Sequence, residues 1–106
     1  MRIAVLCERM AGERRVAVTP EATGALLADG HSVIVESGAG TAAGMPDGAY
    51  LTAGATVAPD LAATVGDAGV VVSVNGPTDG ATLSHLGGSH VVIGLFDPFW
   101  LPDVAA

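Results

Sequence analysis

Short apolar runs alternate with segments of helical character along the chain. The continuous runs at Ile3–Leu6, Val33–Val35 and Val70–Val72 are typical of strands buried on both faces of a sheet, and the last of them predicts a strand over Val70–Val74. Residues 56–58 and 91–96 predict two further strands, and residues 20–29, 47–53, 60–65 and 78–86 predict helices between the strands. This order favours an α/β fold: a small, doubly wound, flavodoxin- or Rossmann-like and mostly parallel sheet of about five strands with flanking helices.

The first helix has the clearest start signal. Thr19 is a hydroxyl N-cap, Pro20 suits the first helical position, and Glu21 places an acid in the first turn. The pattern puts three apolar residues on one helical face, namely Ala22, Ala25 and Leu26. A single domain is expected over residues 1–96, followed by an irregular tail over 97–106 that contains two prolines.

The segment VESGAGTAAG at 35–44 begins like a dinucleotide-binding loop. Its glycines, Gly38, Gly40 and Gly44, are spaced G-x-G-x-x-x-G, whereas the fingerprint needs G-x-G-x-x-G between the first strand and a long helix. Here the loop follows the second strand, and the next helix is short. We therefore interpret the glycines as a tight connection that relieves backbone crowding, and we assign no cofactor-binding residue to them.

Charge narrows the classes of partner. The formal net charge is −7, the four basic residues are all arginines, and charged residues make up only 14% of the chain. Such a surface repels nucleic acids and anionic membranes. The apolar fraction of 50% indicates apolar surface that a partner, a second copy or a further part of the protein covers. The sequence has no segment long enough to span a membrane.

Cys7 is the only cysteine, so neither an internal disulfide nor a zinc site is expected. A buried, inert thiol in a reduced, cytoplasmic setting fits best. His31, His85 and His90 lack metal-ligand spacing, and no serine has the context of a nucleophile. We therefore assign no catalytic residue and no metal ligand.

The loop after the first strand and the end of the fourth strand carry the candidate chemistry. Ligands of open parallel sheets bind beyond the carboxyl ends of the strands, and Arg14, Arg15 and Asn75 follow strands there. An arginine can bind a carboxylate or phosphate with two parallel hydrogen bonds. Equally, Arg14 and Arg15 can pair with Glu8 and Glu13 and only fix the loop. Asn75 can contact a ligand or serve ordinary turn chemistry.

The first forty residues carry a specific resemblance. They read as a first strand, an acidic and basic loop, R-V-A-V-T-P at 15–20, a helix, G-H-S-V at 30–33, and E-S-G-A-G at 36–40. This resembles the amino terminus of the alanine dehydrogenase and NAD(P) transhydrogenase family. Ala53-Gly54-Ala55 and the run at 72–77 fit more loosely, so the resemblance spans nearly the whole chain.

Within that family, residue types separate two branches. Alanine dehydrogenases carry a lysine at the position of Asn75, which holds the substrate carboxylate together with an arginine at the position of Arg15. They also carry a catalytic histidine near residues 96–97. This chain has neither the lysine nor that histidine. Val74-Asn75-Gly76-Pro77 instead resembles the V-N-x-P of the transhydrogenase alpha subunit, although Asp97-Pro98 departs from that branch's Trp-Pro.

The resemblance implies that the chain is the amino-terminal segment of the alpha subunit of a proton-translocating NAD(P) transhydrogenase. That enzyme transfers hydride between NAD(H) and NADP(H). The segment would form one wall of the NAD(H) cleft, with Arg15 and Asn75 at its edge. The Rossmann nucleotide-binding segment of the family lies beyond residue 106. The domain is therefore expected to be incomplete, to bind no NAD by itself, and not to be catalytically self-sufficient.

The implied partners are the remainder of the alpha subunit and its membrane subunits. They would place the chain in the cytoplasm, peripheral to the inner membrane and not inserted into it. Two other interpretations stay open: a non-catalytic interaction or oligomerisation module that docks through Phe99-Trp100, and a truncated relative of alanine dehydrogenase.

Overall fold

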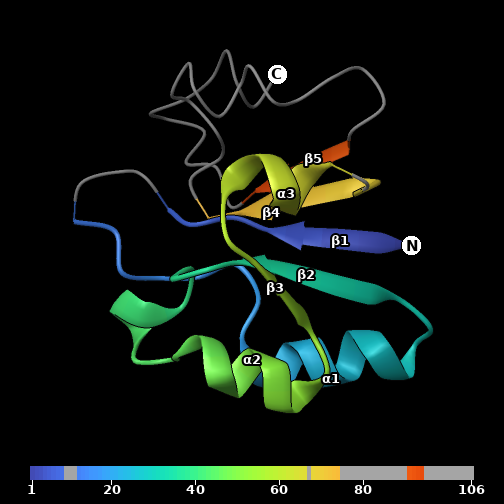
Figure 1. The fold of residues 1–106 in the computed structure, drawn as a ribbon, viewed down its shortest axis with the longest axis horizontal. Helices are drawn as coiled ribbons and strands as arrows, with labels where there is room; N and C mark the ends of the chain where they lie inside the picture. Colours follow the sequence, from blue (N-terminus) through green and yellow to red (C-terminus); the bar gives the residue numbers. More distant parts are fainter. Residues whose placement is uncertain (9–11, 67, 75–90, 95–106) are drawn as a thin grey trace.

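The computed structural model describes residues 1–8, 12–66, 68–74 and 91–94. Strands and helices alternate through this part of the chain (Figure 1). In chain order they are β1 (Arg2–Val5), α1 (Pro20–Ala28), β2 (Ser32–Glu36), the 3₁₀ turn η1 (Thr41–Ala43), α2 (Asp47–Ala53), β3 (Thr56–Ala58), α3 (Leu61–Val65), β4 (Val70–Ser73) and β5 (Val91–Gly94).

The five strands form one sheet in the order β3-β2-β1-β4-β5, and every neighbouring pair is parallel. The predicted α/β class and its parallel sheet are therefore confirmed. The chain first winds outward from β1 to β3 and then returns to the other side of β1. The direction of winding thus reverses between β1 and β4, which is the topological switch point where ligands of such sheets bind.

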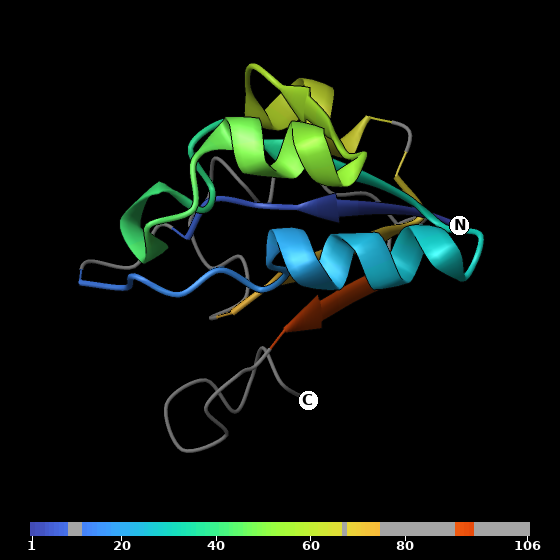
Figure 2. The same ribbon diagram turned by 90° about the horizontal axis from the view of Figure 1, so that it is seen from below.

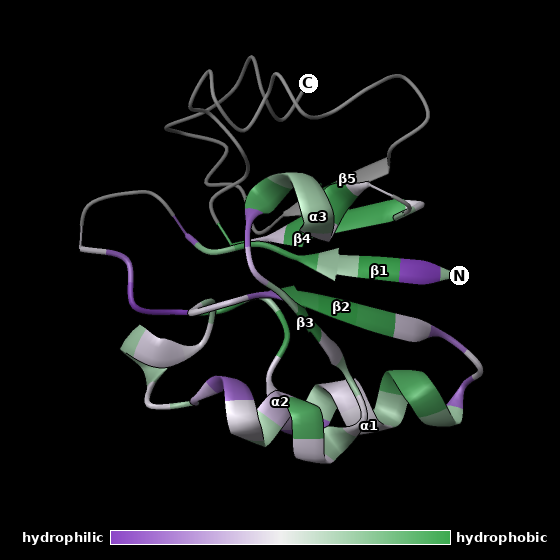
Figure 3. Ribbon diagram, viewed as in Figure 1, coloured by the Kyte–Doolittle hydropathy of each residue, from purple (hydrophilic) through white to green (hydrophobic). Residues whose placement is uncertain are grey.

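The sheet separates two hydrophobic layers. Alternate residues of the central strands face opposite sides, as the two-residue period of a strand requires: Val5 and Val35 pack on the side of α1 and α2, and Ala4 and Ile34 on the side of α3. Figure 2 shows the helices on the two sides of the sheet. Figure 3 shows hydrophobic strands and a more hydrophilic loop after β1.

Helix α1 begins as predicted, and of the three apolar residues expected on one face only Leu26 packs, partly buried, against the core. The Thr19 side chain accepts a hydrogen bond from the Ala22 N–H, and Pro20 is the first helical residue. Ala22 and Ala25 are exposed, however, whereas Thr23 is fully buried. The Thr23 hydroxyl donates to the Thr19 carbonyl at 3.0 Å, so its polar atom is satisfied within the helix and the side chain can face the core.

The other described elements agree closely with the predicted ranges. Asp60, expected at the start of a helix, is the N-cap of α3, and its carboxylate accepts from the Ala63 N–H. The turn η1 was not predicted. The expected helix at 78–86 and the irregular tail at 97–106 lie outside the described residues. Among the described helices, none combines the length and apolar character needed to cross a membrane.

Candidate functional site at the carboxyl edge of the sheet

The parallel strands bring the residues that follow β1, β2 and β4 to one edge of the sheet. Because β1 and β4 are neighbours at the switch point, Glu8 after β1 lies beside the end of β4. Its carboxylate accepts hydrogen bonds from the Val74 N–H at 2.8 Å and from the Ser73 hydroxyl at 3.1 and 3.2 Å. Glu8 thus ties the loop after β1 to the last residue before Asn75.

A second carboxylate ties β1 to β2 at the same edge. Glu36 is buried, with 6% of its surface exposed, and accepts from the Cys7 N–H at 2.9 Å. The Cys7 thiol donates to the Ser37 carbonyl at 3.3 Å. Cys7 is half-buried, and therefore less buried than predicted; it lies beyond the end of β1. Two carboxylates therefore hold three strand ends in fixed relation.

The loop after β1 contains a cluster of donors around a single carboxylate. Four N–H groups reach the Glu13 carboxylate: the backbone N–H of Arg14 at 3.0 Å, and the backbone N–H, Nε and Nη2 of Arg15 at 2.9, 2.9 and 2.7 Å. The two guanidinium contacts fall on different carboxylate oxygens. This is the two-bond geometry with which arginine binds planar oxyanions.

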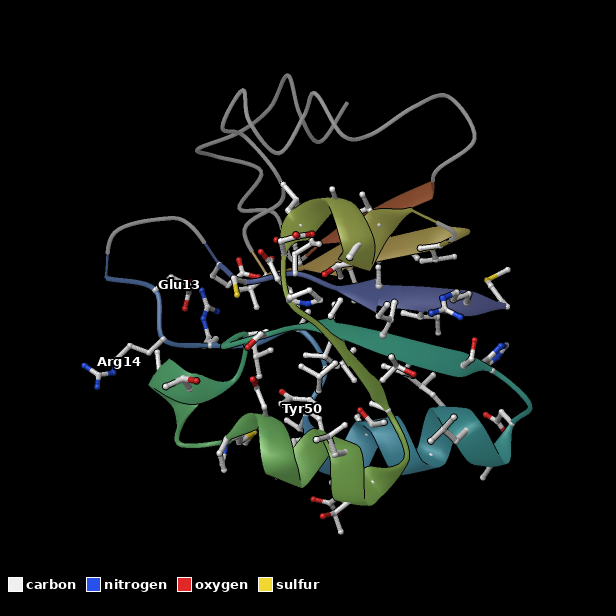
Figure 4. All side chains as sticks on the ribbon, viewed as in Figure 1. Glu13, Arg14 and Tyr50 are labelled. Atoms are coloured by element: carbon white, nitrogen blue, oxygen red, sulfur yellow. The ribbon has the colours of Figure 1, made fainter. Side chains whose placement is uncertain are left out.

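Burial and charge differ sharply within this pair. The Glu13 side chain is only 9% exposed, whereas the Arg15 side chain is 66% exposed. The hydrogen bond and charge of Glu13 raise the pKa of Arg15, with a further contribution from Glu8. Arg15 therefore lies in the field of both carboxylates, at the edge where β1 and β4 end. In Figure 4, Arg14 extends away from the body of the protein, and Glu13 lies inside the loop.

The two interpretations of the arginines can now be compared with this geometry. The pairing of Arg15 with Glu13 is present, as the local interpretation predicted. Arg14, by contrast, makes no side-chain ion pair with any residue in the described part of the chain. Asn75 lies outside the described residues, so its role as a cleft-edge residue stays a prediction.

The glycine loop is held by a carboxylate of the following helix. Asp47, the first residue of α2, accepts from the Ser37 hydroxyl at 2.6 Å and from the Gly38 N–H at 2.9 Å. These two bonds lower the pKa of Asp47, since both stabilise its ionised form. Gly38 has a φ of +87°, a conformation that favours glycine. The N–H that a nucleotide phosphate would need at Gly38 is therefore bound by the protein's own carboxylate.

Gly40 is required by the packing of Tyr50. A Cβ on Gly40 would lie 2.6 Å from the Met45 carbonyl oxygen and 2.8 and 2.9 Å from Tyr50 ring and hydroxyl atoms. Tyr50 is fully buried between α2 and the sheet (Figure 4) and donates to the Val18 carbonyl at 2.8 Å. The space beside Gly40 is thus filled by the protein, and these residues do not fit a nucleotide phosphate. This geometry agrees with the interpretation of the glycines as a tight connection.

Sequence reasoning did not find the bridging roles of Glu8, Glu36, Asp47 and Tyr50. Glu36 offered one signal, because it is a charged residue at the end of a continuous apolar strand, and a charge there needs a partner. Asp47 and Tyr50 offered none, since their partners are 10 and 32 residues away along the chain. In the described residues, no three His, Cys, Asp or Glu side chains are grouped to hold a metal ion.

Comparison with known proteins agrees with this fold. Residues 4–106 match the family described as "Alanine dehydrogenase/PNT, N-terminal domain". The chain belongs to this family. It is 40% identical over 98 residues to NAD(P) transhydrogenase subunit alpha of Cereibacter sphaeroides, covering 92% of this chain and 18% of that protein. It is also 42% identical over 77 residues to alanine dehydrogenase of Bacillus subtilis, covering 73% and 20%.

The structural comparison extends over the same region. The crystal structure of transhydrogenase from Sinorhizobium meliloti superposes with a TM-score of 0.87 at 31% identity, covering 98% of this chain and 30% of that chain. The predicted similarity to the amino-terminal part of the transhydrogenase alpha subunit is therefore confirmed. This member of the alanine dehydrogenase/PNT family spans between 18% and 30% of the length of these relatives.

Proposed function

We propose that the chain is the amino-terminal segment of a proton-translocating NAD(P) transhydrogenase alpha subunit, and that its carboxyl edge forms one wall of the NAD(H) cleft. The observation that carries this proposal is the arrangement at the switch point. Glu8 holds the end of β4 against the loop after β1, so the loop with Arg15 and the residue before Asn75 meet at the switch point, where ligands of such sheets bind.

In the proposed role, the chain helps to position a ligand in the cleft and does not bind the nucleotide by itself. The donors and space of the glycine loop are taken by Asp47 and Tyr50, which supports a binding site for the pyrophosphate elsewhere in the full protein. At the β1 loop the exposed guanidinium of Arg15 suits a carboxylate or a phosphate oxygen of a ligand. The proposed partners are the rest of the alpha subunit and its membrane subunits, with the assembly at the cytoplasmic side of the inner membrane.

A chimera tests this proposal directly. The chain would replace the matching segment of the Cereibacter sphaeroides alpha subunit, and hydride transfer between NADPH and an NAD analogue would be measured in membranes. We expect activity that depends on the segment and that falls when Arg15 is replaced by alanine. A folded, assembled chimera with no hydride transfer would refute the proposal, and an assembled chimera carrying the native segment is the positive control.

Two further measurements separate the competing functions. The isolated chain should bind NADH with a Kd weaker than about 1 mM; micromolar binding would contradict a role limited to one wall. Similarity to alanine dehydrogenase supports the second candidate. To test this candidate, the chain would replace the matching segment of the Bacillus subtilis enzyme, and the turnover of pyruvate, ammonia and NADH would be measured. Turnover by this chimera, together with an inactive transhydrogenase chimera, would favour the alanine dehydrogenase branch over the transhydrogenase branch.

A further inference from the structure

The Glu13 carboxylate is held by a set of convergent hydrogen-bond donors. Two backbone N–H groups and two guanidinium N–H groups converge on it within 2.7–3.0 Å. We call these four donors, from Arg14 and Arg15, the oxyanion cradle. Convergent backbone and guanidinium donors are the usual means by which proteins hold carboxylates and phosphates. The cradle is formed, and its occupant is a side chain of the same loop.

The occupant also cancels the charge that would attract a ligand. Arg15 brings one positive charge to the edge, and Glu13 neutralises it in a two-bond pair. Glu8 adds a second negative charge within the field of Arg15. An approaching anion therefore meets a cradle that is filled and an Arg15 charge that Glu13 neutralises. Removing the charge of Glu13 would weaken its hold on the donors and take away one of the two negative charges that oppose an anion at Arg15.

We propose that Glu13 is an internal competitor for the oxyanion of a ligand at Arg15, so that a ligand carboxylate or phosphate binds only when the Glu13 side chain leaves the cradle. The proposal rests on the proposed function only in taking Arg15 as part of the ligand cleft. Its consequence is quantitative. If the cradle is open for a fraction of the time, the apparent affinity falls by that fraction, and occupancy of 90% by Glu13 corresponds to a tenfold loss.

The test is an anion titration of the whole chain, 1–106, followed by NMR at the backbone N–H of residues 14 and 15 in every variant, and also at the Nε–H wherever Arg15 is present. Inorganic phosphate and sodium pyruvate are the two probes, titrated separately at constant low ionic strength. The variants are Glu13→Gln, Glu13→Ala, the double variant Glu13→Gln/Arg15→Ala, and Glu21→Gln. Glu21 is an exposed acid of the first turn of α1, so Glu21→Gln removes the same charge away from the cradle.

We expect Glu13→Gln and Glu13→Ala to lower the Kd for at least one probe tenfold or more. Glu21→Gln should change it less than twofold, and the double variant should lose the gain. A gain confined to phosphate assigns a phosphate ligand, and a gain confined to pyruvate assigns a 2-oxo acid carboxylate. An unchanged Kd in both Glu13 variants, an equal gain in Glu21→Gln, a gain that survives in the double variant, or no binding by any variant would overturn the proposal.

This result is independent of the chimera assay. If anion affinity rises tenfold in the Glu13 variants and the chimera is inactive, Glu13 is a competitor and the transhydrogenase role is refuted. If the chimera is active and anion affinity does not rise, the transhydrogenase role is kept and the proposal that Glu13 competes is refuted. Unchanged resonances of buried Val5 and Val71 would show that each variant keeps its fold.

Discussion

Two loops at the carboxyl edge, one after β1 and one after β2, both present N–H groups that suit an anion, and both have those groups bound by a carboxylate of the protein. After β2, the carboxylate is Asp47 of the next helix, and the loop packs beside buried Tyr50. After β1, the carboxylate is Glu13, adjacent in sequence to the donors it binds, and neither Glu13 nor Arg15 belongs to a hydrophobic cluster.

The difference separates a structural loop from a candidate ligand loop. Displacing Asp47 would break the hydrogen bonds that join the first residue of α2 to the loop after β2, whereas the hydrogen bonds from Arg14 and Arg15 to Glu13 join neighbouring residues of one loop. We therefore expect a ligand to compete with Glu13 at a lower cost to the fold than with Asp47. The glycine-rich sequence is thus the more conspicuous motif, and we propose the arginine loop as the better candidate for a ligand site. The predictions below test this contrast by comparing the stability cost of changes in each loop.

The largest effect is expected from Gly40→Ala. The added methyl group would overlap the Met45 carbonyl and the Tyr50 ring. Because Gly40 has a φ of −95°, which alanine adopts without backbone strain, the cost of the substitution comes from this steric overlap. We expect a loss of about 3 kcal/mol in the free energy of unfolding, measured by urea denaturation with circular dichroism. The control is Gly48→Ala in α2, where the methyl group meets open space. A loss below about 1 kcal/mol for Gly40→Ala would mean that the loop tolerates a side chain and is not fixed by packing.

Tyr50→Phe should cost less, because it keeps the ring and removes only the hydrogen bond to the Val18 carbonyl. The expected loss is about 1–2 kcal/mol. Burial raises the pKa of Tyr50 above its ordinary value, with the charge of Asp47 adding to the shift. A raised pKa means that the neutral phenol is favoured in the folded state, so this contribution is present below about pH 10 and is lost as pH rises further.

Stability should therefore be measured from pH 8 to pH 11 for both proteins. The wild type is expected to lose stability above pH 10 more steeply than Tyr50→Phe does. Parallel pH curves for the two proteins would show that the buried phenol does not contribute to this dependence.

The sequence predicted the sheet and most element bounds, because those depend on local patterns. Apolar runs such as Val70–Val74 and the Thr19-Pro20-Glu21 cap specify strands and helix starts within a few residues. Burial along α1 does not follow hydropathy, since the exposed Ala22 and Ala25 are more apolar than the buried Thr23. The hydrogen bond from the Thr23 hydroxyl to the Thr19 carbonyl satisfies the buried polar atom, and a hydropathy pattern does not show it.

The position of the candidate site was predictable, whereas the contacts within it were not. Topology places every loop that follows a parallel strand at one edge, so Arg15 could be assigned there from the sequence. The two hydrogen-bond partners of Glu8 could not be assigned from the sequence, because Ser73 and Val74 are 65 and 66 residues away. Whether a carboxylate braces the fold or competes with a ligand depends on such distant contacts, and no local pattern encodes them.

Asp47→Ala should have an intermediate effect, with a distinct dependence on pH. The Ser37 hydroxyl and Gly38 N–H lower the pKa of Asp47, so the stabilisation is present above about pH 4 and is lost as pH falls through the lowered value. We expect Asp47→Ala to cost about 1 kcal/mol at pH 7 and the difference from wild type to narrow between pH 5 and pH 2. A constant difference over that range would indicate that Asp47 acts without its charge.

The smallest effect on stability is expected from Glu13→Gln, and this completes the contrast between the loops. The four hydrogen bonds that Glu13 accepts from Arg14 and Arg15 lie within one loop, so their loss should loosen the loop and leave the two hydrophobic layers intact. We expect the Tm to change by less than about 3 °C, while amide exchange at Arg14 and Arg15 becomes faster. A fall in Tm as large as that of Tyr50→Phe would show that Glu13 braces the fold as Asp47 does. The β1 loop would then be as structural as the glycine loop, and no ligand could displace Glu13 without a comparable cost in folding free energy.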